Sequence, residues 1–508
     1  MADLQHTTST SSPAATSPQR FILSSPARTF LLSAMGLGLL CLIMIFFNDD
    51  QFHTRFWTNI LHNSIFFTGI SLFALFFYAA NVVALGGWIV SFKRLWEAYA
   101  QFLVVGLILM LIIAGGLFFG YHHLYHWNDE TLRTSDKVIM GKSGFLSKGF
   151  YTGFTILALG TWIFLAKKIR AISLDEDVNG NSGFSHHIQL RKYSSMALPL
   201  IGFMSAACIW LWVMSLDAHW YSTMFAWYSS ASLFVSMLVL TIGIILYMKS
   251  RGYLVEVTTE HLHDLAKFTF AFSIFWTYLW FSQYMLIWYS NIGEETTYFR
   301  QRFDHYKILY YANLILNFLL PFLILMRNDT KRKVGTLIFV ALLVFFGHWI
   351  DYFQMIKPGT LNTAHELIEN RAEIGHIKPL EAKPMEVAKT SEKDSITPTA
   401  IAESKSGEHK GITQDTSKGA AMAMETKKDD HNTASAVEKK TEESEGEGEH
   451  KSESSFVTGF TLPGLLEIGV LIGFLAGFLL FVFNEVGKAP LQAKNDPYYA
   501  ESLHHHVQ

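Results

Sequence analysis

The sequence places an imidazole and a carboxylate three positions apart inside a long apolar run. His348 and Asp351 fall within residues 335–356, a stretch dominated by Val, Leu, Ile and Phe. At this spacing both side chains lie on one face of a helix, so the imidazole can hydrogen-bond the carboxylate or pass it a proton. Ionisable residues are costly inside a bilayer and commonly mark ion or proton pathways. We therefore predict that this pair takes part in proton transfer.

Other ionisable residues gather at the ends of apolar runs. Asp217 and His219 follow one run, and Glu294 and Glu295 follow another. Two adjacent carboxylates repel each other, which favours proton uptake by one of them. We predict an outer proton half-path made of the following residues: Asp217, His219, Glu294, Glu295, His348 and Asp351.

A second group, His263 and Asp264, precedes the apolar run 268–289 and is predicted to lie near the inner end of such a path. Structural alternatives stay open for both groups. Glu294 and Glu295 fit a solvated helix cap or a contact with Arg300 and Arg302, and the segment 261–267 fits an interfacial anchor.

The sequence lacks the residues that hold most redox cofactors. Cys41 and Cys208 are its two cysteines, whereas an iron–sulfur cluster takes four and attached haem c needs Cys-x-x-Cys-His. It has no Walker loop, no dinucleotide-binding glycine motif and no Gly-x-Ser-x-Gly elbow. His62 and His348 lie well inside apolar runs and are the remaining candidates for haem b, although chance placement is favoured. We predict no catalytic, cofactor or metal site in this chain.

These residues belong to a chain with two regions of very different amino-acid composition. Of its 508 residues 50% are hydrophobic, a composition that excludes an ordinary soluble enzyme. Residues 361–455 hold 13 Lys and Arg and 20 Asp and Glu, with hardly any aromatic residue. Such a segment cannot bury enough apolar area to offset chain entropy, so we predict a disordered insert. The net charge of −3 also argues against a nucleic-acid partner.

The apolar remainder predicts an all-α integral membrane protein. A helix crosses the roughly 30 Å hydrocarbon core in about 20 residues, and ten runs are long enough. They are residues 29–47, 60–82, 99–120, 149–166, 196–216, 221–247, 268–289, 308–326, 335–356 and 462–483.

The runs also predict how the chain is organised and oriented. An acid, a His and a Trp recur at 217–220 and 348–351, which suggests two four-helix bundles and two flanking helices. Basic residues number 18 on one side of the predicted topology and 8 in the short loops of the other, so both termini are predicted to be cytoplasmic. The predicted parts are a disordered leader (1–28), a flanking helix and loop (29–58), the two bundles (59–219 and 220–360), a periplasmic insert (361–455), a last helix (456–486) and a cytoplasmic tail (487–508).

Three stretches resemble one known family. The most specific is residues 267–298, KFTFAFSIFWTYLWFSQYMLIWYSNIGEETTY; the others are GHWIDY at 347–352 and the tail from Leu466 to His506. They resemble the ActF subunits of bacterial alternative complex III, within the NrfD or polysulfide-reductase membrane-subunit class. The resemblance covers nearly all predicted spans and excludes the leader and the insert. Gly293 departs from the family pattern, because Pro is expected before the paired glutamates.

The resemblance implies a ten-helix subunit of a complex that oxidises menaquinol in the bacterial cytoplasmic membrane. It implies the partner subunits ActA, ActB, ActC, ActD and ActE, with haem c and iron–sulfur clusters in the partners, and a terminal cytochrome oxidase as a further partner. ActF would then be a structural partner of the quinol-binding subunit and a proton path. Two alternatives remain open: a secondary transporter of ions or solutes, and a chain that itself binds quinol in an aromatic pocket near Asp217, Trp220 and Trp227.

Overall fold

The computed structural model describes residues 19–180, 184–373 and 459–505. The chain divides into two units, residues 1–380 with 451–508 and residues 381–450, and every described residue belongs to the first. The described residues form helices and no strand. Helices suit a membrane because each one satisfies its own backbone hydrogen bonds. The all-α membrane fold class is therefore confirmed.

All ten predicted spans lie in helices. In chain order these are α1 (Ser25–Phe47), α2 (Thr54–Val83), α3 (Lys93–Gln101) with α4 (Leu103–Phe119), α7 (Lys148–Asn179), α8 (Ser185–Trp212), α9 (Thr223–Ser250), α10 (Thr259–Ser290), α12 (Lys307–Leu314) with α13 (Leu320–Leu325), α14 (Val334–Glu373) and α16 (Leu465–Gly487). Nine helices in the described part are long and apolar enough to cross a membrane. The tenth predicted span, 268–289, lies in α10, which is not among these nine helices. α10 also extends beyond the apolar run, and the turns it adds at its start are polar.

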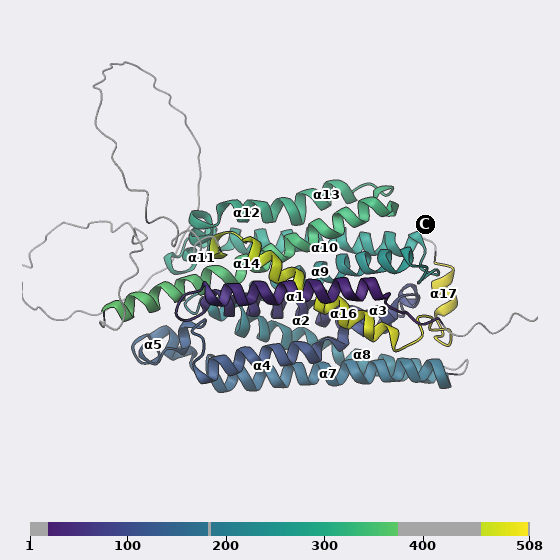
Figure 1. Cartoon of the computed structure of the whole chain (residues 1–508), viewed down its shortest axis with the longest axis horizontal. Coiled ribbons are helices and arrows are strands. Elements are labelled where there is room, and N and C mark those ends of the chain that lie inside the picture. Colours follow the sequence, from purple (N-terminus) through teal and green to yellow (C-terminus); the bar gives the residue numbers. More distant parts are fainter. Residues whose placement is uncertain (1–18, 181–183, 374–458, 506–508) are drawn as a thin grey trace, which may run out of the picture. The chain divides into compact units, whose positions relative to one another are not determined.

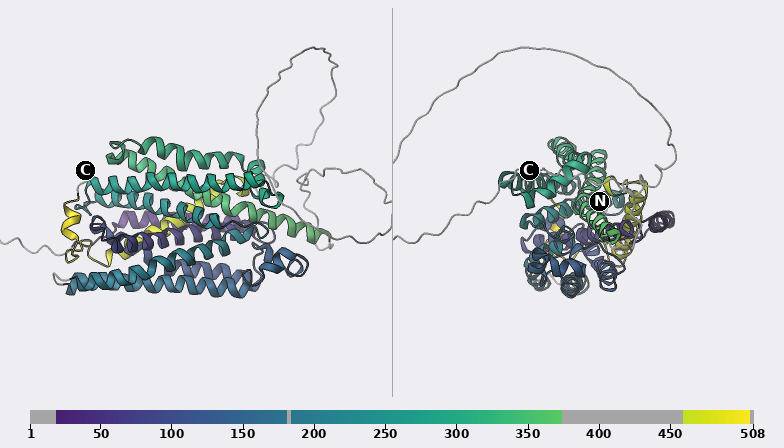
Figure 2. Two further views of the ribbon diagram at one scale, coloured as in Figure 1. Left: turned by 180° about the vertical axis from the view of Figure 1, so that it is seen from behind. Right: turned by 90° about the vertical axis from the view of Figure 1, so that its left-hand side faces the viewer.

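Helix contacts form the two predicted sets of four. α2, α3 with α4, α7 and α8 pack as the first bundle, and α9, α10, α12 with α13, and α14 pack as the second. α2 contacts both α9 and α14, so the bundles meet along these helices. The end-on view in Figure 2 separates the blue helices of the first bundle from the green helices of the second. α2 and α9 are buried on nearly all sides, whereas α1 is largely exposed.

The flanking helices α1 and α16 pack against each other through glycines. A Cβ atom added to Gly38 would lie 2.4 Å from the Cα atom of Gly473, so these backbones touch without intervening side chains. Small residues at such a crossing allow the close approach on which packing in a bilayer depends. Figure 1 shows α1 and α16 crossing along the side of the bundles.

The two ends of the bundles differ in what covers them. Residues 488–505, including α17 (Tyr499–Leu503), cross one end, which we call the tail end (Figure 1). The short helices α5 (Glu130–Ser135), α6 (Lys137–Lys142) and α11 (Gly293–His305) lie at the opposite end, which we call the insert end. α14 continues through Glu373, so the predicted insert begins within a helix. The leader up to residue 18 and residues 374–458 of the insert region lie outside the described residues.

Candidate functional site

The carboxylate of Asp351 is the centre of a polar cluster inside the second bundle. Its Oδ1 atom accepts a hydrogen bond from the Tyr228 hydroxyl and another, of 2.7 Å, from the Asn313 amide. Its Oδ2 atom accepts a 2.9 Å bond from the Trp276 indole. These donors come from α9, α12 and α10, so every element of the second bundle reaches this carboxylate. We define the Asp351 cluster as Tyr228, Ser232, Trp276, Asn313, His348 and Asp351.

His348 lies beside the carboxylate but hydrogen-bonds another group. Its Nδ1 atom is 3.0 Å from the hydroxyl of Ser232 and 4.0 Å from Oδ2 of Asp351. The longer distance exceeds a hydrogen bond. The Nε2 atom of His348 has no hydrogen-bond partner among the described residues. Both side chains are fully buried, so a proton passing between them needs a small movement or an intervening group.

A local departure from α-helix positions Asn313. Between α12 and α13 the chain forms a π-helical turn, η4 (Ile315–Leu319), of the kind that often occurs at functional sites. Within it, Asn317 donates a 2.5 Å bond to the side-chain oxygen of Asn313. A Cβ atom on Gly347 would lie 2.1 Å from Oδ1 of Asn317. Glycine at position 347 therefore makes room for the asparagine that holds Asn313.

The first bundle connects to this region through one tryptophan. The Trp349 indole donates a 3.1 Å bond to Oδ1 of Asn63, and Nε2 of His62 donates a 3.1 Å bond to the Trp349 carbonyl. The His62 ring stacks on the Trp349 ring at 4.9 Å. Because Nε2 of His62 is occupied by a carbonyl, this geometry gives no support to the haem b alternative considered for His62 and His348.

Buried charges continue from α2 toward the insert end. Arg55 donates to both carboxylate oxygens of Glu467, at 2.6 and 3.0 Å, which joins α2 to α16. Lys357 of α14 is also fully buried, and its Nζ atom has no hydrogen-bond partner among the described residues. That atom lies 4.8 and 5.4 Å from the ring centroids of Phe460 and Phe353. The bidentate pair of Arg55 and Glu467 is directional as well as charged.

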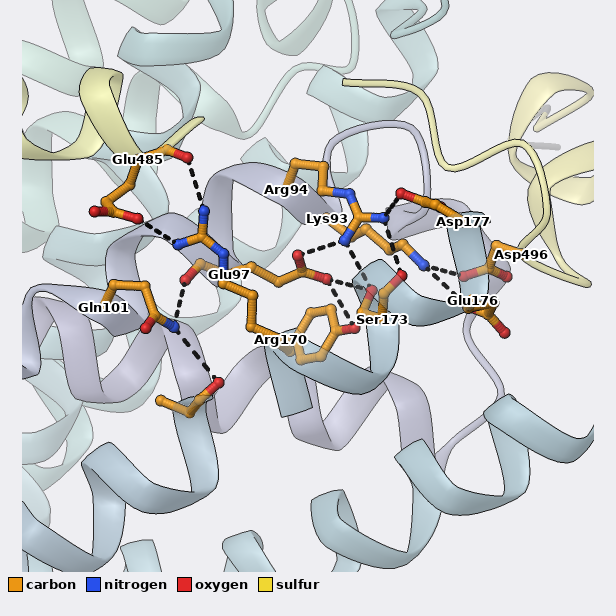
Figure 3. Close-up of polar contacts among 12 residues, drawn as sticks. Lys93, Arg94, Glu97, Gln101, Arg170, Ser173, Glu176, Asp177, Glu485 and Asp496 are labelled. Atoms are coloured by element: carbon orange, nitrogen blue, oxygen red, sulfur yellow. Dashed lines mark hydrogen bonds and ion pairs between the residues drawn. The ribbon is translucent and has the colours of Figure 1, made fainter. Parts of the chain in front are cut away.

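A second cluster occupies the first bundle near the tail end. Oε2 of Glu97 accepts a 2.6 Å bond from Arg94, and its Oε1 atom accepts bonds from the hydroxyls of Ser173 and Tyr78 at 2.6 and 3.2 Å. Arg94 also pairs with Asp177. Figure 3 shows Arg94 and Glu97 of α3 converging with Ser173 and Asp177 of α7.

The same cluster takes in the end of the chain. Lys93 lies 2.5 Å from Asp496 and 3.5 Å from Glu176. We define the tail-end ion cluster as Tyr78, Lys93, Arg94, Glu97, Ser173, Glu176, Asp177 and Asp496. Nearby, Arg170 donates a 2.8 Å bond to Glu485 of α16 (Figure 3). Buried cations and carboxylates are thus matched against one another across four segments of the chain.

The remaining outer candidates do not join the Asp351 cluster directly. Asp217 lies 3.6 Å from the Arg302 guanidinium. His219 is exposed and lies 2.5 Å from Asp136, whose pKa is lowered by that hydrogen bond. Glu294 and Glu295 occupy the first turn of α11, and in the described part of the chain neither forms an ion pair with Arg300 or Arg302.

The inner candidates lie where the tail meets α10. Asp264 pairs with Lys267 at 3.1 Å and with His505 at 2.7 Å. His263 is buried, and neither of its ring nitrogens has a hydrogen-bond partner among the described residues. The structure thus places His263 and Asp264 at the tail end, away from the outer candidates.

His122 and Asp49, in the connections at the insert end, also have shifted pKa values. Burial lowers the pKa of His122 to about 4, and its Nε2 atom donates to the Ile113 carbonyl. Burial and the neighbouring Asp50 raise the pKa of Asp49 to about 7. The Asp49 carboxylate also accepts backbone bonds from Arg55 and Phe56 at the start of α2. It therefore serves as a helix cap as well as a titratable group.

Sequence reasoning missed most partners of the two clusters. Tyr228, Trp276 and Asn313 converge on Asp351 from three other helices, and no local spacing encodes that convergence. A detectable signal was the Asn313 and Asn317 pair, four residues apart in an otherwise apolar run. Lys357 was visible as a lone cation near the end of a run, and Glu97 follows Arg94 at helical spacing.

The two tryptophans of the predicted aromatic pocket lie in different environments. Trp227 is mostly exposed, and Trp220 stacks on Tyr298 at 3.9 Å. A small pocket is lined by Tyr298, Trp280 and Tyr310. Within the described ranges, no three His, Cys, Asp or Glu side chains are grouped so as to hold a metal ion. Comparison with protein-family models and with curated proteins gives no match to this chain.

Proposed function

We propose that this chain is a membrane subunit of a respiratory quinol-oxidising complex of the alternative complex III type. In this proposal it is a structural partner of the quinol-binding subunit and contributes a proton path. Haem c and iron–sulfur clusters belong to partner subunits, and menaquinol is the substrate of the whole complex. The chain resides in the bacterial cytoplasmic membrane with its tail end toward the cytoplasm.

One observation carries the proposal: two of the three stretches that resemble the ActF family contact each other. Trp276, in the stretch 267–298, donates to Asp351 in the stretch 347–352. His505, in the third stretch, pairs with Asp264, three residues before the first stretch begins. Two segments of the resemblance therefore meet in one buried cluster.

The proton path is supported by the chemistry of the Asp351 cluster. Asp351 is a carboxylate at 0% exposure within a membrane helix, held by neutral donors and lying near an imidazole. Buried carboxylates and histidines of this kind commonly relay protons. His348 and Asp351 are the central groups of the proposed outer half-path, and Asp217, His219, Glu294 and Glu295 are its other members. His263 and Asp264 belong to the inner half.

The subunit proposal is tested by what purifies with the chain. An affinity-tagged copy is isolated from native membranes, its partners are identified by mass spectrometry, and haem c absorbance and iron–sulfur resonance spectra are recorded. We expect co-purifying subunits that carry both kinds of centre. Isolation as a colourless protein without partners would overturn the proposal, and substrate-dependent uptake by that isolated protein in liposomes would favour a secondary transporter.

The proton path has its own test in the assembled complex. Proton release per electron is measured for His348→Leu and Asp351→Asn complexes, with Asp304→Asn as a control because Asp304 is half-exposed and pairs with exposed Arg300. We expect the ratio to fall for the two buried positions and to stay unchanged for the control. An unchanged ratio in all three complexes would remove the proton path while leaving the subunit proposal intact.

A further inference from the structure

Three cations meet where the connection between α13 and α14 lies against α10. That connection contains η5 (Thr330–Arg332), which packs on α10 near the tail end. Burial first, and then the nearby cations Lys267 and Arg332, lower the pKa of the Lys331 ammonium. We define the η5 cation group as Lys267, Lys331 and Arg332. Like charges this close disfavour one another, so the group favours a nearby anion.

The two carboxylates beside the η5 cation group already have cationic partners. Glu260 accepts two bonds from the Arg332 guanidinium, at 3.0 and 2.9 Å. Asp264 lies 3.1 Å from the amine of Lys267 and 2.7 Å from the imidazole of His505. Each carboxylate is therefore committed to a cation other than Lys331.

Lys331 is buried without a counter-ion. It is 6% exposed, and no carboxylate of the described residues lies within ion-pair distance of its amine. Its Nζ atom donates a 3.3 Å bond to Oδ1 of Asn328 and lies 5.3 Å from the ring centroid of Phe270. An ammonium has three donors, and burying its charge without a partner is costly. An anion beside Lys331 would offset that cost.

His263 adds a second buried donor next to the same group. It precedes Lys267 by four residues, so the two side chains share a face of α10. It is 2% exposed, and neither ring nitrogen has a hydrogen-bond partner among the described residues. Burial first, and then the three cations of the group, lower the pKa of His263, so its ring is neutral at pH 7. A neutral imidazole offers one N–H, which an anionic oxygen can accept.

Apolar side chains continue from the cations along α10 and α13. The Phe270 ring stacks on the Phe322 ring of α13 at 5.5 Å. One turn farther from the tail end, Ile274 of α10 and Leu319 at the end of η4 are exposed. The cations themselves lie at the ends of bilayer-length apolar runs, where headgroups give way to acyl chains. A molecule with an anionic group followed by apolar chains matches this order.

We infer that the η5 cation group binds the phosphate of an anionic phospholipid, with an acyl chain along Ile274 and Leu319. The side chains of Lys267 and Arg332 are partly exposed and open to the phosphate. A zwitterionic lipid would add an ammonium of its own, for which the neighbouring carboxylates, already paired, offer no partner. The inference goes beyond the proposed function and does not depend on it.

Native mass spectrometry of the purified, delipidated full-length chain tests the inference. Phosphatidylglycerol, phosphatidylethanolamine and inorganic phosphate are titrated separately, and bound molecules are counted by mass. We expect the first phosphatidylglycerol to bind about fivefold more tightly than the first phosphatidylethanolamine, the factor expected for one cation at a membrane surface.

Three results would overturn the inference. Equal binding of the two lipids would remove the preference for an anionic headgroup. Retention of inorganic phosphate in preference to lipid would make the group a site for free phosphate. The absence of any tightly bound lipid would leave this surface to an acidic segment of a partner protein.

Variants make the result specific to the η5 cation group. Lys331→Gln and Lys267→Gln each remove one positive charge, and we expect each to weaken binding of the first phosphatidylglycerol about fivefold. The control is Lys192→Gln on α8, which removes the same charge from an exposed position in the first bundle. Equal weakening in the control would indicate general surface attraction and would contradict the inference. Lys267 has a side chain that is 43% exposed, so its variant keeps the test valid if Lys331→Gln does not fold.

The lipid site and the subunit proposal are judged by different measurements. Lipid binding uses the chain without partners, whereas the subunit proposal is judged by co-purification. A chain that purifies with redox subunits but shows no preference for phosphatidylglycerol would retain the proposed function and lose the lipid site. A chain that prefers phosphatidylglycerol but purifies alone would do the reverse.

Discussion

In the first bundle the buried carboxylate of Glu97 lies against the guanidinium of Arg94, whereas in the second bundle the buried carboxylate of Asp351 is held by neutral donors. Fixed cations neutralise the first carboxylate at all times. The second carboxylate has only hydrogen bonds and an imidazole 4.0 Å away. The comparison teaches that a buried acid can be held in two ways, by a permanent counter-charge that links helices through ion pairs or by neutral hydrogen-bond donors that leave it without a fixed cation.

Removing the Arg94 cation from the tail-end ion cluster should have the largest effect. Arg94→Met leaves Glu97 and Asp177 buried without that counter-charge, and breaking a buried pair in this way costs about 3–5 kcal/mol. We expect a loss of this size in the apparent free energy of unfolding, measured by denaturant titration in mixed micelles. Arg300→Met is the matched control, because the Arg300 side chain is 74% exposed and its ion pair contributes little. Similar losses in both variants would contradict the comparison.

Removing the acceptor from the Asp351 cluster should reduce the free energy of unfolding by a smaller amount. Asp351→Leu leaves the hydroxyl of Tyr228, the indole of Trp276 and the amide of Asn313 without their acceptor. Each unsatisfied donor costs about 1–3 kcal/mol, but neutral side chains can turn toward other acceptors, so we expect a total loss of about 2–4 kcal/mol. No cation is stranded, so the loss should not depend strongly on salt. The same titration measures it, and Asp351→Asn should recover part of the stability because one acceptor oxygen remains. A loss larger than that of Arg94→Met would reverse the contrast between the clusters.

A neutral buried imidazole provides a third environment for comparison. Since burial lowers the pKa of His122 to about 4 from an ordinary 6.5, the unfolded chain takes up a proton at this site before the folded chain does. The contribution is fully present above pH 6.5 and is lost as pH falls toward 4, by up to about 3 kcal/mol at 1.36 kcal/mol per pH unit. Unfolding measured across this range should be less pH-dependent in His122→Phe, whereas His504→Phe, at an exposed position in the tail, should follow the wild type.

A single methyl group tests the contact between Asn317 and Asn313 that supports the Asp351 cluster. Gly347→Ala places a Cβ atom 2.1 Å from Oδ1 of Asn317, so Asn317 must move away from Asn313, at a cost of about 1–3 kcal/mol. Gly335→Ala on the same helix is the control, because nothing lies within 4 Å of its added Cβ. Thermal unfolding should separate the two variants. Equal melting temperatures would show that Asn317 does not depend on the glycine.

The sequence predicts the helices and their grouping because both depend on local patterns. Apolar runs of bilayer length are visible without any tertiary information, and all ten fall in helices. The ends of α7, α10 and α14 were harder to predict, since these helices continue into polar segments that hydropathy does not register. Membrane sidedness and the outer and inner halves of the proton path stay predictions.

The candidate residues were predicted less completely than the fold. His348 and Asp351 were found because both lie on one face of one helix. Their hydrogen-bond partners are 38 to 123 residues away along the chain, so only the packing of the four helices reveals them. The repeated Asp, His and Trp at 217–220 and 348–351 also occupy different environments: Asp217 faces a guanidinium, whereas Asp351 faces neutral donors.

The contact between Lys93 and Asp496 has a consequence for how the protein is made. The two residues are 403 positions apart. At a synthesis rate of roughly 5–20 residues per second, the carboxylate emerges about 20 to 80 s after the amine. Most of the helices have been synthesised by then, but the last ion pair of the first bundle still awaits the end of translation. Truncation shortly before Asp496 would therefore release a chain with nearly all its helices and an unfinished first bundle, which is a ready signal for membrane quality control.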